Sequence, residues 1–136
     1  MGTWGAGAFA NDDAMDWLVD LESARDLRII SDALAAVTDV AGYIEAPVGS
    51  IALAAGEVVA ALRGRPSPDL PPEVSQWVQA HALTPDRGLL DLARRAVASL
   101  SSDHERSELQ QLWAEAAAED RDAWADAVAD LQSRLA

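Results

Sequence analysis

The longest apolar stretch of the chain runs from Pro47 to Leu62, where only Ser50 and Glu57 interrupt a series of aliphatic and small residues. A helix that is apolar on all sides belongs in the interior of a protein, with other elements packed around it. The stretch is too short and too interrupted for a membrane span, which needs about 20 apolar residues. We therefore predict a central buried helix within one helical domain that covers residues 1–136.

Apolar residues recur at helical spacing on both sides of this stretch, and no segment alternates with the period of a strand. The pattern predicts amphipathic helices over residues 12–22, 24–40, 72–82 and 85–100. Ser23 with Asp26, and Ser102 with Glu105, have the spacing of helix-starting capping boxes. The last helical region reaches residue 135, and we expect a break or kink in it near Asp120. The fold class is therefore all-α, a compact bundle of about six helices.

Two segments interrupt the helical pattern. Residues 65–71 are rich in proline and predict a stiff surface loop rather than a domain boundary. Residues 1–10 contain three glycines together with Trp4 and Phe9, so we expect a coil that these aromatic side chains anchor on the core. Its Gly5 and Gly7 also suggest an anion cradle, but the spacing is not that of a nucleotide-binding loop and acidic residues follow directly.

Glu57 is the one ionisable residue on the central helix, and a buried carboxylate must be paired or hydrogen-bonded. We predict that the N-terminal coil lies across the central helix and that Glu57 accepts hydrogen bonds from coil amides near Trp4, Gly5 and Gly7, or from the Trp4 indole. The alternative partner is an arginine, such as Arg25 or Arg28.

Other carboxylates give the chain a candidate binding site. Asp12 and Asp16 follow the coil at helical spacing, and Glu45 immediately precedes the central helix. Converging carboxylates bind divalent cations or carry out acid–base chemistry, so Glu45, Glu57 and Asp16 form an alternative metal or small-ligand site. No Glu-x-x-His motif accompanies them. Solvated or capping carboxylates are the more ordinary interpretation, and we expect no cofactor.

The chain is strongly acidic, with a net charge of −13, and all ten of its basic residues are arginine. Such a surface repels phosphate backbones and anionic membranes, so we expect no nucleic-acid or membrane partner. It favours a basic protein partner, if it does more than keep the protein in solution. The oligomeric state is left open.

Composition also limits the chemistry. The chain has no cysteine, which excludes disulfides, thiolate metal sites and a cysteine nucleophile, and fits a reducing cytoplasm. Its two histidines, His81 and His104, have no nucleophile-and-acid arrangement around them in the sequence. We therefore favour a protein that is not an enzyme.

Three segments resemble one known family. The opening WGAGAFANDDAMDWL is similar to the start of a small bacterial family, domain of unknown function 4259. GYIEAPVGSIALAAGEVVAALRG resembles its second signature, and SELQQLWAEA with WADAVADLQSRL resembles its tail. The resemblance covers nearly the whole chain and implies one bacterial domain, but brings no activity, cofactor or catalytic residue.

The functional expectation is therefore a non-enzymatic interaction module of the bacterial cytoplasm. An immunity or antitoxin-like role fits its size and acidity. The alternative is the carboxylate-based metal or small-ligand site, or an enzyme, centred on Glu45 and Glu57. A weaker idea is an acidic mimic of nucleic acid, which needs carboxylates spaced regularly along an exposed face.

Overall fold

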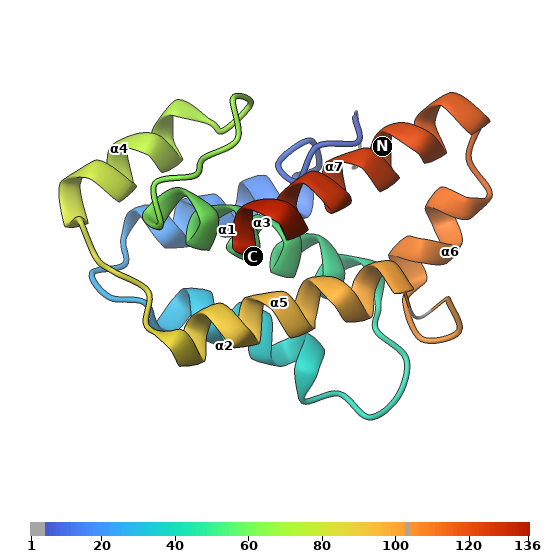
Figure 1. Cartoon of the computed structure of the whole chain (residues 1–136), viewed down its shortest axis with the longest axis horizontal. Helices are drawn as coiled ribbons and strands as arrows, with labels where there is room; N and C mark the ends of the chain where they lie inside the picture. The colour runs from blue at the N-terminus through green and yellow to red at the C-terminus, as the bar shows by residue number, and fades with distance from the viewer. Residues whose placement is uncertain (1–4, 103) are drawn as a thin grey trace.

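A single helix, α3 (Ala46–Leu62), lies at the centre of the computed structural model, which describes residues 5–102 and 104–136 (Figure 1). Within these residues the chain forms seven helices and no strand. The other six are α1 (Asp12–Glu22), α2 (Arg28–Thr38), α4 (Pro72–His81), α5 (Arg87–Ser102), α6 (Glu108–Ala114) and α7 (Ala118–Leu135). The predicted all-α bundle around a central apolar helix is thus confirmed.

The centre of α3 has no face toward solvent. From Gly49 to Ala61 every residue except half-buried Ile51 is buried. In the described part of the chain, α3 contacts each of the other helices, with α2 and α5 below it in Figure 1 and α4 and α7 above it. A helix so rich in alanine and glycine has a thin surface, which lets neighbours approach closely. The backbone at Gly49 comes so close to Leu100 and Leu109 that a Cβ there would stand 2.9 and 2.8 Å from their methyl carbons.

The N-terminus of α3 is held by the start of α6 and by Ser107 just before it. Glu45, the residue before α3, makes no side-chain cap. Instead a carboxylate oxygen of Glu108 accepts a hydrogen bond of 2.6 Å from the Ala46 N–H, where an anion also suits the helix dipole. Beside it, Ile44 and Ser107 form an isolated parallel bridge. Glu108, which lies 62 positions after Ala46, therefore does the capping that Glu45 does not.

Side-chain caps mark the starts of α1 and α6, and two of the helix starts are not where the sequence pattern puts them. α1 begins as predicted after Asn11, whose side chain accepts from the Ala14 N–H at 2.8 Å. α2 begins at Arg28 rather than near residue 24, because Ser23 serves as the C-cap of α1. The Ser102 capping box is also wrong: Ser102 ends α5, and the buried Ser107 caps α6 by accepting from the Gln110 N–H.

The last helical region is divided, as expected, but earlier than expected. α6 ends at Ala114 and α7 begins at Ala118, so the polar run near Asp120 is the first turn of a helix and not its interruption. Glu119 and Asp120 are favourable there, because carboxylates stabilise the positive end of a helix dipole. The break lets the indole rings of Trp113 and Trp124 lie nearly parallel, with centroids 6.1 Å apart.

The glycine-rich coil packs on the core, as predicted, over the residues that the structure describes. Ala6, Ala8 and Phe9 are half-buried against the central cluster, and the Asn11 side chain donates to the Ala8 carbonyl at 3.2 Å. The expected anchoring by Trp4 falls outside the described residues.

None of the described helices combines the length and the apolar character that crossing a membrane requires.

The close approach at Gly49 predicts a large effect of a small substitution. Gly49→Val should lower the free energy of unfolding by about 1–3 kcal/mol, because its branches would overpack Leu100 and Leu109. Ala36→Val, at an exposed position of α2, is the control and should change it by less than about 0.7 kcal/mol. Urea denaturation measures both, and equal losses would show that the approach at Gly49 is not tight.

Candidate functional site

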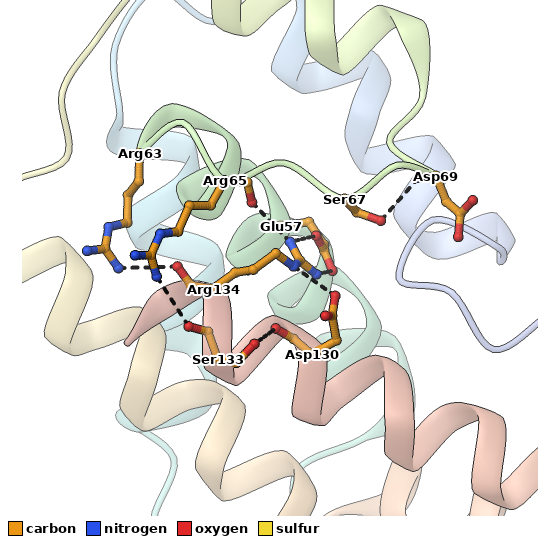
Figure 2. Close-up of polar contacts among 8 residues, drawn as sticks. All are labelled: Glu57, Arg63, Arg65, Ser67, Asp69, Asp130, Ser133 and Arg134. Atoms are coloured by element: carbon orange, nitrogen blue, oxygen red, sulfur yellow. Dashed lines mark hydrogen bonds and ion pairs between the residues drawn. The ribbon is translucent and has the colours of Figure 1, made fainter.

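The carboxylate of Glu57 is held by Arg134, near the end of α7. Arg134 donates from Nη1 to Oε1 at 2.8 Å and from Nη2 to Oε2 at 3.0 Å, a two-point contact between the guanidinium and the carboxylate (Figure 2). The Glu57 side chain is 9 % exposed and that of Arg134 is 14 % exposed. Neither charge is therefore left alone in the interior, where an isolated ion would be strongly unfavourable.

Arg134 connects Glu57 to two further groups. Its Nε donates to Oδ2 of Asp130 at 2.8 Å, one turn earlier on α7, and Nη1 also reaches the Arg65 carbonyl at 3.3 Å. The pKa of the Arg134 guanidinium is raised, mainly by its hydrogen bond to Glu57. Burial acts in the opposite direction and lowers the pKa, but it does not outweigh this hydrogen bond. Since the ordinary value is already very high, Arg134 keeps its charge throughout the pH range of normal measurements.

Other arginines fix the end of α7, and with it the position of Arg134. Arg63 donates to the carbonyls of Arg134 and Ala136 at 3.2 and 2.9 Å, and Arg94 donates to that of Leu135 at 2.6 Å. Arg65 reaches the Ser133 carbonyl at 3.5 Å. These carbonyls lie in the last turn of a helix, where they have no partner within the helix and cations are favourable.

A groove of about 550 Å³ opens beside the Glu57–Arg134 pair. Its walls are the N-terminal coil, the start of α1, the proline-rich loop and one side of α7. They carry mostly apolar side chains, which include Phe9, Met15, Leu70, Pro71 and Ala127. Charged residues of three elements also line it: Glu57 of α3, Asp130 and Arg134 of α7, and Asp69 of the loop. Its volume lies within the usual range of ligand sites, and apolar walls with few polar groups are typical of them.

The structure brings some of the predicted site residues together and separates others. Gly7 lines the groove with Glu57, so coil and central helix do meet there. Glu45 does not join them, since it precedes α3 and lies twelve residues, about 18 Å of helix, from Glu57. Asp12 and Asp16 are exposed on α1, and Gly5 borders a smaller cavity with Ser50 and Leu53.

The expected partners of Glu57 need correction. In the described part of the coil no amide bonds to its carboxylate, whose hydrogen bonds come from Arg134. The arginine alternative was right in kind but wrong in residue, because Arg25 and Arg28 are exposed around the start of α2. The Trp4 indole falls outside the described residues. Among residues 5–102 and 104–136, no three acidic, histidine or cysteine side chains form a group that could hold a metal ion.

Sequence reasoning missed Asp69, Asp130 and Arg134. The four-residue spacing of Asp130 and Arg134 does indicate a pair on one helix face. Nothing in that spacing indicates that the face turns toward Glu57, which lies 77 positions earlier. The direction depends on how α7 crosses α3, which is a property of the packed bundle.

The Glu57–Arg134 pair predicts coupled losses of stability. Glu57→Ala should cost about 2–4 kcal/mol, because it leaves the Arg134 charge without its main partner in a mostly buried place. The double variant with Arg134→Ala should cost at least about 1 kcal/mol less than the sum of the single variants.

The same denaturation cycle on Asp91 and Arg94 is the control. Their side chains are 55 % and 41 % exposed, so a coupling below about 0.5 kcal/mol is expected for that pair. Additive losses at Glu57 and Arg134 would show that the two side chains do not stabilise the fold as a pair.

The comparisons with known proteins agree with the resemblance of the sequence. No curated protein and no solved structure matches the chain. One family model matches residues 2–127, which include the coil, α3 and Glu57, while Asp130 and Arg134 lie beyond the matched stretch. Because the match extends over most of its length, the chain belongs to the family described as domain of unknown function (DUF4259).

Proposed function

We propose that the protein is a non-enzymatic interaction module whose partner is a basic protein. The observation that carries this proposal is a difference between the acidic and the basic side chains in how many of them are engaged within the protein. Nearly all described carboxylates are exposed, with Glu57 and Glu108 as the exceptions. Many arginines, in contrast, donate to groups of the protein itself.

The engaged arginines turn their guanidinium groups toward backbone carbonyls or toward Glu57. They are Arg63, Arg65, Arg94, Arg106 and Arg134. Their charges are therefore held near the end of α7 and at the α5–α6 connection. Elsewhere the exposed carboxylates are opposed by few cations, so the surface available to a partner is more negative than an even distribution of the net charge would make it. Such a field attracts and orients a basic surface.

The state of Glu57 supports a binding role over catalysis. A general base needs a carboxylate that is free to accept a proton from a substrate. Both oxygens of Glu57 instead accept hydrogen bonds from Arg134. The absence of cysteine fits a partner that is met in a reducing compartment such as the cytoplasm.

The proposal predicts which proteins the chain captures. Immobilised protein in a lysate of its source organism should retain a basic protein, which mass spectrometry identifies. Calorimetry with that purified protein should then show an affinity that falls steeply between 0.1 and 1 M salt, where the Debye length shortens from about 10 to 3 Å.

Duplex DNA at the same concentration should give no gel shift, because phosphates meet the same carboxylates. A partner that is acidic, or one whose affinity does not change with salt, would overturn the proposal.

A further inference from the structure

We propose that the groove beside Glu57 and Arg134 receives a basic apolar segment of the partner: an arginine side chain beside Asp69 and Asp130, flanked by apolar side chains. This inference rests on the proposed function and adds to it the place and the chemistry of recognition. The negative electrostatic field of the whole surface would attract any basic protein. The groove would select a partner segment in which arginine lies next to apolar residues.

The groove beside Glu57 and Arg134 is negatively charged. Glu57 and Arg134 neutralise each other through their two-point contact. Asp130 uses Oδ2 to accept from Arg134, and its side chain is still 60 % exposed. The Asp69 carboxylate has no hydrogen-bond partner among the described residues, since only its backbone N–H is engaged, with Ser67 Oγ (Figure 2). The two aspartates leave the groove with a net negative charge.

The two carboxylates come from separate parts of the fold. Asp69 belongs to the proline-rich loop and Asp130 to α7, so they approach the groove from two different elements. The prolines around Asp69 limit the motion of the loop, because each fixes its own φ angle. The backbone positions of the two aspartates are therefore set by the fold before any ligand arrives, which reduces the entropy lost on binding.

The walls of the groove suit an arginine with apolar neighbours. An anionic ligand would be repelled by both aspartates. A neutral apolar ligand would displace water from their carboxylates without replacing the hydrogen bonds, which is also unfavourable. A guanidinium offers donors in a planar fork that suits carboxylates. Phe9 lines the same groove and adds an aromatic ring on which a cation is favourable. The apolar walls, among them Leu70 and Ala127, would take the side chains next to the arginine.

The volume agrees with an occupant of this size. About 550 Å³ can hold a few side chains but not a folded element. A short extended segment of the partner, rather than a helix or a flat surface, is the occupant that fits.

The test uses two fluorescein-labelled hexapeptides of equal charge, alternating Leu-Arg and alternating Ser-Arg, with fluorescence anisotropy on the full chain. The proposed function alone predicts that both peptides bind, with similar affinity. The groove predicts that the Leu-Arg peptide binds at least about tenfold more tightly, the effect of burying one leucine side chain.

Matched variants locate the difference. Ala127→Leu narrows the groove and should abolish the advantage of the Leu-Arg peptide, while Ala123→Leu, at an exposed position of the same helix, should preserve it. The double variant Asp69→Asn with Asp130→Asn should lower the affinity for the Leu-Arg peptide. The loss should exceed that in the control Asp120→Asn with Asp126→Asn, which removes the same charge elsewhere. Thermal melting and amide NMR spectra confirm that each variant is folded.

Each outcome separates the two claims. Equal affinity for the two peptides would contradict recognition in the groove but not binding of a basic partner. The same holds for a higher affinity for the Leu-Arg peptide that persists in Ala127→Leu. No binding of either peptide at low salt would overturn both.

Discussion

The fold depends on one constraint: a helix without a polar face needs other helices on every side. α3 meets this need by contacting every other helix in the described part of the chain. Most of its side chains are small, so its neighbours come close enough to touch its backbone, as Leu100 and Leu109 do at Gly49. The same constraint makes Glu57 an exception that the structure must compensate. Arg134 provides that compensation from the far end of the chain.

The pair also links stability to the candidate site. Arg134 reaches Glu57 only because α7 lies across α3, with its last carbonyls held by Arg63, Arg65 and Arg94. In that position α7 forms one wall of the groove, opposite the coil and the proline-rich loop. Three of the ten arginines are used for this purpose, so positive charge gathers at the end of α7. The contacts that hold this helix end therefore also determine where part of the positive charge of the surface lies.

Local patterns predicted much of the fold. The apolar stretch predicted the position of α3, and the helical spacing of apolar residues predicted the bounds of α1, because both signals involve residues close together in the chain. A helix start is harder to predict where two residues could cap it. Ser102 and Ser107 both have suitable side chains, and only the packing of the chain places Ser107 at the start of α6. The need of Glu57 for a partner was also predictable, from elementary electrostatics. Its partner and the groove were not, because they depend on how helices distant in sequence cross.

Native-state hydrogen exchange of the full chain tests most directly whether α3 is the element on which the others depend. Amides in the buried part of α3, from Ala52 to Ala60, should exchange more slowly than those of any other helix. The opening that exposes these amides should have a free energy equal to that of global unfolding. The reason is that α3 becomes solvated only when the surrounding helices separate from one another. Faster exchange in α3 than in α2 or α5, through a partial opening that leaves those helices folded, would contradict the account.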